Sequence, residues 1–121
     1  MVKNIKTEEK IIDANGRTLG RVASEAAMSL MGKTRVSYER NVYCGLPVKV
    51  INAGKLRITA KKLGEIYHTR YSGIPGGLRI LKGSETAQKE GLKELVRLAI
   101  IQMLPGNKLR RKMLEHLTIE E

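Results

Sequence analysis

The first third of the chain places a short apolar run before a helix-like pattern. Residues 11–14 read Ile-Ile-Asp-Ala and precede Asn15-Gly16, a dipeptide that favours a tight turn. Apolar residues then recur at three- and four-residue intervals, as on one face of an amphipathic helix. That face consists of Leu19, Val22, Ala23, Ala26 and Leu30. The pattern therefore predicts a strand at 11–14 and a helix that Thr18 caps, that runs to about Met31 and that Gly32 ends.

The middle of the chain holds shorter apolar segments and many turn residues. Residues 48–52 are apolar at nearly every position, which is typical of a buried parallel strand. Leu56 and Ile58 alternate with polar residues and predict a short strand or an extended turn with one solvated face. Residues 64–71 predict another strand. Residues 72–77 contain three glycines and a proline, which predicts a tight loop there.

The last third has a helical pattern. One apolar face extends over about 91–104 and consists of Leu92, Leu95, Val96, Ala99 and Met103. Pro105-Gly106 should end this helix, and Asn107 can begin another that runs to about His116. Strands that alternate with helices are typical of α/β proteins. We therefore expect an α/β sandwich with a small parallel or mixed sheet.

Length and composition set further bounds. A chain of 121 residues fits one compact domain, with residues 1–10 as a solvated arm and residues 117–121 as a short C-terminal tail. The single cysteine, Cys44, excludes an internal disulfide framework and is typical of a reducing compartment. The sequence lacks a long uncharged apolar stretch and an apolar signal region, so we expect neither a membrane span nor a leader peptide.

The net charge is the strongest indication of a partner. Lys and Arg number 23 against 12 Asp and Glu, which gives a formal charge of +11. Such a charge opposes the compact state through self-repulsion, and a polyanion would relieve that repulsion. We expect nucleic acid as the partner. A membrane surface is disfavoured because no basic helix has the broad apolar face of a membrane-surface helix. The remaining alternative is incidental charge on a highly soluble protein.

The aromatic content narrows the mode of RNA recognition. The chain has four tyrosines and neither Phe nor Trp. Domains that read bases by stacking need exposed aromatic side chains. We therefore expect Arg and Lys to recognise the RNA backbone and its shape.

Patterns that resemble catalytic or metal sites are incomplete. Gly32-Lys33-Thr34 resembles the end of a phosphate-binding loop, but Ala27 stands where that loop needs a glycine. The motif also ends a helix instead of starting one. His68 and His116 are far apart in sequence and, with one cysteine, offer no metal-ligand cluster. We expect no enzyme activity, no catalytic residue, no metal, no cofactor and no small-molecule substrate.

Arg17 and Arg21 flank the start of the first predicted helix, four residues apart on its polar face. Cations at a helix N-terminus oppose the helix dipole. Free backbone N–H groups together with two guanidinium groups form a strong phosphate site. The alternative is that these arginines pair with Glu25 and other acidic residues.

Further basic residues cluster without balancing acids. They lie in the irregular segment 33–47, around the extended piece near Arg57, and in the helix after Pro105. The glycines of residues 72–77 would let a sugar-phosphate chain approach closely, although a plain connecting turn is an equal alternative. The predicted RNA-binding residues are Arg17, Arg21, Lys33, Arg35, Arg40, Lys55, Lys61, Lys62, His68, Arg70, Tyr71, Ser72, Gly73, Gly76, Gly77, Lys108, Arg110, Arg111 and Lys112.

Four motifs in order resemble a known family. They are DANGRTLGR at 13–21, VINA at 50–53, SGIPGGL at 72–78 and MLPGNKL at 103–109. Over about residues 10–118 the chain resembles bacterial large-subunit ribosomal protein thirteen, in a short version with little C-terminal tail. The resemblance implies a three-layer α/β/α sandwich with a small, mostly parallel four-stranded sheet.

The same resemblance implies a function. It indicates a structural constituent of the large ribosomal subunit that binds rRNA and supports early subunit assembly, with no enzymatic role. The implied partners are large-subunit (23S-type) rRNA and neighbouring ribosomal proteins, and the implied location is the ribosome in the cytoplasm. The alternative is an extra-ribosomal RNA-binding regulator acting on a messenger RNA. A nucleotide-dependent enzyme is a weaker rival, against which Ala27 argues.

Overall fold

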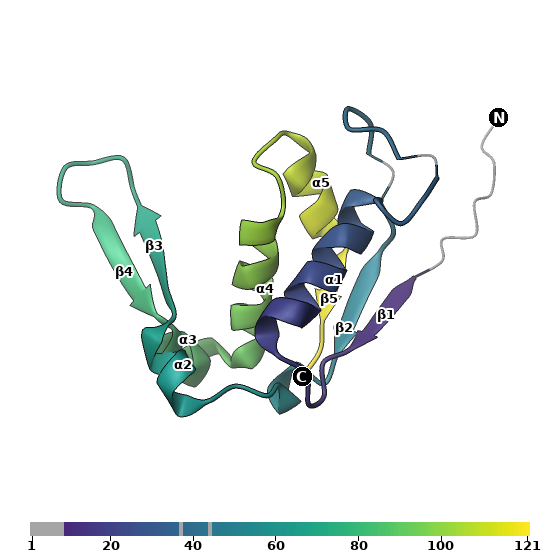
Figure 1. The fold of residues 1–121 in the computed structure, drawn as a ribbon. Helices are drawn as coiled ribbons and strands as arrows, with labels where there is room; N and C mark the ends of the chain where they lie inside the picture. The colour runs from purple at the N-terminus through teal and green to yellow at the C-terminus, as the bar shows by residue number, and fades with distance from the viewer. Residues whose placement is uncertain (1–8, 37, 44) are drawn as a thin grey trace.

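The chain opens with a β-α-β unit, as predicted (Figure 1). A computed structural model describes residues 9–36, 38–43 and 45–121; residues 1–8 of the expected arm and Cys44 lie outside this range. Strand β1 (Lys10–Asp13) leads into helix α1 (Leu19–Met31), and strand β2 (Val48–Ile51) pairs with β1 in parallel.

The turn and the two ends of α1 follow from their residues. Gly16 has a φ of 71° and Gly32 a φ of 82°, left-handed conformations that favour glycine. The Gly32 N–H donates to the carbonyls of Met28 and Ser29, which ends the helix. Thr18 occupies the N-cap position but its side chain makes no capping hydrogen bond. The predicted helix bounds are confirmed.

The main sheet contains a strand that we did not predict. Strand β5 (Leu117–Ile119) pairs with β2 in parallel, so the strand order is β1-β2-β5. The Val48 N–H donates to the His116 carbonyl, and the Glu120 N–H donates to the Val50 carbonyl. Residues 117–121, expected as a tail, therefore hold the third strand of the sheet.

The remaining two strands form a separate sheet. Strands β3 (Tyr67–Tyr71) and β4 (Leu78–Lys82) pair antiparallel through the loop at residues 72–77. Our expectation of four strands in one mostly parallel sheet is therefore corrected, over the residues that the structure describes, to three parallel strands and a two-stranded hairpin. The short loop joins β3 and β4 as neighbours, so they pair with each other.

The segment before the hairpin differs from its prediction. A 3₁₀ turn (Ala53–Lys55) is followed by an extended stretch with Leu56 buried, which fits the predicted turn and not the strand. Helix α2 (Ala60–Glu65) then occupies the start of the strand predicted over 64–71. The Thr59 hydroxyl accepts a hydrogen bond from the Lys62 N–H, which starts this helix.

The C-terminal helices match their predictions closely. Helix α4 (Leu92–Met103) ends before Pro105, and helix α5 (Leu109–Glu115) follows.

Strand β4 and helix α3 (Gly83–Glu90) had no counterpart in the sequence pattern. Helix α3 buries only Gly83 and Thr86, so it lacks the apolar periodicity that would reveal it.

The core lies between one face of the sheet and the helices. Ile12, Val48 and Val50 are buried in the same cluster as Val22 of α1 and Ile100 of α4. On the other face of the sheet, Ile11 is 59% exposed. The described residues thus cover one face of the sheet, and the expected three-layer order stays a prediction.

The hairpin stands apart from the sheet, on the opposite side of α4 (Figure 1). Buried His68 of β3 lies with its Nδ1 atom 2.9 Å from Nε2 of Gln102 in α4. The Gly83 N–H donates to the Ile66 carbonyl over 2.7 Å. Helix α4 therefore packs against α1 and the core on one side and contacts the hairpin on the other.

Candidate nucleic-acid interface

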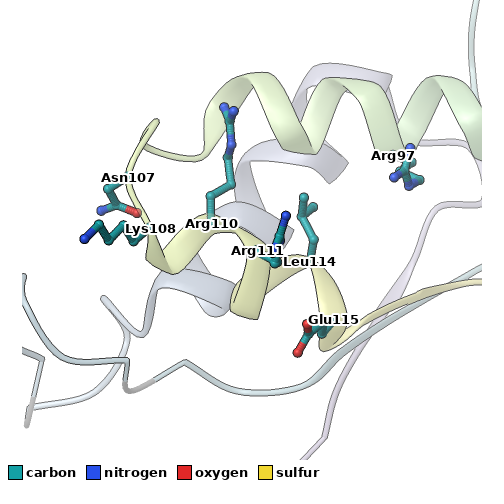
Figure 2. Close-up of a pocket in the computed structure, with 7 residues that line it drawn as sticks. All are labelled: Arg97, Asn107, Lys108, Arg110, Arg111, Leu114 and Glu115. Atoms are coloured by element: carbon teal, nitrogen blue, oxygen red, sulfur yellow. The ribbon is translucent and has the colours of Figure 1, made fainter.

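Basic side chains surround an open cavity of about 740 Å³ between α4 and α5. Figure 2 shows Arg97 on α4, Arg110 and Arg111 on α5, and Lys108 in the connecting turn. The other residues that line this cavity are Asn107, Leu114 and Glu115. Because Arg97 pairs with Glu94, the positive charge of this site comes from Lys108, Arg110 and Arg111 against the one carboxylate of Glu115, an excess suited to phosphate. We call it the cationic cavity.

Local sequence explains why these cations face outward. Met113 of α5 is buried, and Leu109 packs against the core. The apolar face of α5 is therefore turned inward, which leaves Arg111 exposed and Arg110 partly exposed. The chain reverses at Pro105-Gly106, so α5 returns towards the face of α4 that carries Arg97.

Arg97 is a site residue that the sequence analysis missed. Its Nη1 atom lies 3.2 Å from Oε1 of Glu94, three residues earlier on the same helix. In the sequence this pairing makes Arg97 look like an ordinary balanced surface charge. The signal that could have found it is the Pro105-Gly106 break, because two helices joined by a short turn lie side by side.

A second cavity, of about 360 Å³, lies beside the first, and Asn107 lines both. Lys33 and Arg40, two predicted contacts, line it together with Met31, Tyr38, Glu39, Val42, Pro105, Leu109 and Met113. We call it the mixed cavity. The structure thus brings basic residues of the 33–47 segment next to those of α5. Arg35 is half-buried, and its backbone N–H donates to the Gly32 carbonyl.

Arg17 and Arg21, the two arginines predicted to bind phosphate together at the start of α1, have different surroundings. Arg17 forms an ion pair with Glu25, with Nη1 2.6 Å from Oε2, and Lys10 reaches the same carboxylate at 3.7 Å. The alternative reading is therefore correct for Arg17. Arg21 is exposed and lines a cavity of about 290 Å³ with Arg57 and Lys62.

The hairpin loop presents exposed backbone, and its glycines are needed by the turn itself. Gly73 has a φ of 86° and Gly76 a φ of 81°. A Cβ atom at Gly77 would overlap the Ser72 hydroxyl. These constraints explain the glycines without a ligand, so the plain-turn alternative accounts for them. Tyr71 is exposed next to the loop.

Two predicted contacts of the hairpin are placed unfavourably for RNA. His68, expected on the surface, is only 9% exposed because it packs towards α4 and meets Gln102. Arg70 lines a cavity of about 190 Å³ whose other charged residues are Lys89 and three glutamates, Glu85, Glu90 and Glu94. Those carboxylates would repel a phosphate.

The other predicted cations are exposed. They are Lys55 at the end of the 3₁₀ turn, Lys61 in α2 and Lys112 in α5. Among the described residues, Arg17 is the one predicted RNA contact that forms an ion pair. The surplus positive charge is therefore available to a partner.

The basic residues gather at two ends of the molecule. In Figure 1 the start of α1 lies with α2 at the lower end, whereas the turn between α4 and α5 lies at the upper end. The Arg21 cavity belongs to the lower end, and the cationic and mixed cavities belong to the upper end. The predicted residues thus form at least two patches.

Two findings concern other classes of site. Within the described ranges, no three His, Cys, Asp or Glu side chains come together as metal ligands. In the same part of the chain, no helix combines the length and apolar character needed to cross a membrane.

Comparison with known proteins agrees with the motifs. The sequence model of the family described as Ribosomal protein L13 matches residues 7–120. The chain is 43% identical over 122 residues to the "Large ribosomal subunit protein uL13" of Aquifex aeolicus, covering 98% of this chain and 83% of the relative. Identity to the protein of the same name from Thermosipho africanus is 39% over 117 residues, covering 97% and 78%. On these matches, the chain belongs to the Ribosomal protein L13 family.

Proposed function

We propose that this protein is a structural constituent of the large ribosomal subunit that binds 23S-type rRNA and supports early subunit assembly. Family membership and the name of its relatives, "Large ribosomal subunit protein uL13", support this role. Its place is then the ribosome in the cytoplasm, among rRNA and neighbouring ribosomal proteins. The observation that carries the proposal is the cationic cavity, where Lys108, Arg110 and Arg111 outnumber the single carboxylate of its lining, and where Arg97 pairs with Glu94.

The proposed mechanism is electrostatic and geometric, with no catalytic step. Lys108, Arg110 and Arg111 would neutralise phosphates and release the counterions condensed on the RNA. Arginine also fits phosphate through two parallel N–H donors, which fixes orientation as well as charge. Because binding relieves the repulsion within a chain of charge +11, the protein should be more stable on rRNA than alone.

The two basic ends suggest how the protein would support assembly. The packed core fixes the cationic cavity and the Arg21 cavity relative to each other. A rigid body that holds two backbone segments at once would lower the entropy of the unassembled RNA. Assembly support would therefore require both patches, whereas simple RNA affinity would survive partial loss of either.

Filter binding to large-subunit rRNA tests the proposal. The Arg110→Ala/Arg111→Ala variant should lower the slope of log affinity against log salt by about 1.5, at roughly 0.7–0.9 for each lost phosphate contact. The matched control is Lys89→Ala/Lys93→Ala, which removes the same charge from exposed positions outside the cationic cavity. An equal loss of slope in both variants would show that only net charge matters and would overturn the assigned site.

Sedimentation separates this role from the messenger-binding alternative, which nothing in the comparisons favours. The protein should comigrate with large subunits at physiological salt. If the cellular pool instead sediments free of subunits, the ribosomal role proposed here is wrong.

A further inference from the structure

The mixed cavity combines an apolar floor with a charged rim. Met113 is 4% exposed, and both Met31 and Leu109 pack against the core. Val42 and Tyr38 form further walls, at 52% and 37% exposure. A site that served only phosphate would need no such apolar depth.

The size and the polar groups of this cavity fit a single nucleotide. Its volume of about 360 Å³ lies at the low end of the range of about 300–1,000 Å³ for small-ligand cavities. Lys33 and Arg40 offer positive charge for a phosphate. Glu39 offers a carboxylate that can accept a hydrogen bond from an N–H group of a base. A phosphodiester group has no such donor.

Its position next to the cationic cavity makes RNA the fitting source of that nucleotide. Asn107 lines both cavities. Its Oδ1 atom accepts the Leu109 N–H over 3.1 Å, which directs the side chain and leaves its NH₂ group to donate. A strand whose phosphates cross the cationic cavity would therefore bring its next nucleotide to the mixed cavity.

We propose that the mixed cavity receives one unstacked base of the bound RNA, with the adjoining phosphate at Lys33 and Arg40. Single-stranded RNA loops present such bases, and proteins bind them by packing against their faces. The methionine sulfurs and the Tyr38 ring provide polarizable packing partners for the base. This inference rests on the proposed function and adds base contact to the backbone contact expected from the sequence.

Methionine methyl NMR tests the cavity directly on the wild-type protein. The methyl groups of Met31 and Met113 report on the cavity, and those of Met28 and Met103 serve as internal controls outside its lining. Guanosine monophosphate at millimolar concentration should shift the first pair saturably and leave the second unchanged. Inorganic phosphate and ribose 5-phosphate should produce much smaller shifts. No shift with the nucleotide, or an equal shift with phosphate, would overturn the proposal.

A side chain of another protein could occupy the mixed cavity in place of a base. The same NMR titration distinguishes these two occupants. N-acetyltyrosinamide carries an aromatic ring without a phosphate. If it shifts Met31 and Met113 as strongly as the nucleotide does, the cavity is a general apolar dock and the nucleotide assignment is wrong.

Filling the cavity tests its use by rRNA. Val42→Trp should lower rRNA affinity about tenfold, the effect of about one lost base contact, and lower the salt slope by no more than the one phosphate contact at Lys33 and Arg40. Val36→Trp is the matched control, because Val36 is fully exposed and does not line the cavity. If the wild-type protein binds rRNA and Val42→Trp binds equally well, this inference fails and the proposed function stands. If the wild-type protein binds no rRNA, the proposed function itself fails.

Discussion

Asn52 donates its side-chain amide to Oδ1 of Asp13 over 3.0 Å and so joins the ends of β2 and β1. The same oxygen accepts the Asn15 N–H at 3.0 Å. Asn52 has a φ of 58° and is the one non-glycine residue with a positive φ in the part of the chain that the structure describes. Two loops that are 39 residues apart in sequence are thereby held at one edge of the sheet.

The backbone of Asn52 separates two substitutions that both remove this hydrogen bond. Asn52→Ala should be less stable than Asn52→Gly by about 0.5–1 kcal/mol. The left-handed backbone conformation is strained for alanine and not for glycine. Glycine loses more backbone entropy on folding, which offsets part of this stability difference. Urea unfolding of the two variants measures it. Equal stability would show that the loop relaxes out of the left-handed region.

Lowering the pH should reduce the contribution of Asp13 to the free energy of unfolding. The Asn52 hydrogen bond, followed by the Asn15 N–H, lowers the pKa of Asp13 below its ordinary value despite some desolvation, and Lys55 and Arg17 lower it further. A carboxyl whose pKa is lower in the folded state stabilises the fold above its unfolded pKa of about 4 and loses that contribution as pH falls through the folded pKa. The stability advantage of the wild-type protein over Asp13→Asn should therefore shrink between pH 5 and pH 2. A constant difference in urea unfolding across that range would contradict the pKa shift.

Arg17 and Arg21 should behave differently in RNA binding although they lie four residues apart. Arg21→Ala should reduce the salt slope of rRNA affinity by about 0.7–0.9, the value for one phosphate contact. Arg17→Ala should reduce it less, because Glu25 already neutralises that guanidinium. Filter binding over a salt series, with far-UV circular dichroism as a folding control, measures both. A larger effect of Arg17→Ala would show that this ion pair breaks on binding.

Two glycines next to the hairpin should respond in opposite directions to alanine. A Cβ atom at Gly83 would lie 2.9 Å from the Leu63 carbonyl oxygen and 3.1 Å from the Ile66 Cβ, so Gly83→Ala should destabilise by about 1–2 kcal/mol. Gly64 lies in α2 with nothing within 4 Å, and Gly64→Ala should stabilise by about 0.4–1 kcal/mol. Thermal unfolding compares the two, and a loss of stability in both variants would refute the packing argument at Gly83.

Local sequence determined helices α1 and α4 and the breaks that follow them. The bounds of α1 and α4 follow from apolar periodicity, and the breaks at Gly32 and Pro105 follow from backbone chemistry. Both strands of the parallel β1-β2 pair were expected, and the near-continuous apolar run at 48–52 indicated a buried parallel strand. The surplus positive charge, which led us to expect nucleic acid as the partner, was visible in composition alone.

The tertiary structure decided which distant residues meet. Three residues at 117–119 are too few to show a strand pattern, and they become β5 because β2 has a free edge beside them. Arg97 joins Arg110 and Arg111 only through the reversal after α4, and Arg17 pairs with Glu25 of α1 while its side chain stays partly exposed. Pairing, cavities and ion pairs depend on distances between segments, which periodicity along one segment does not encode.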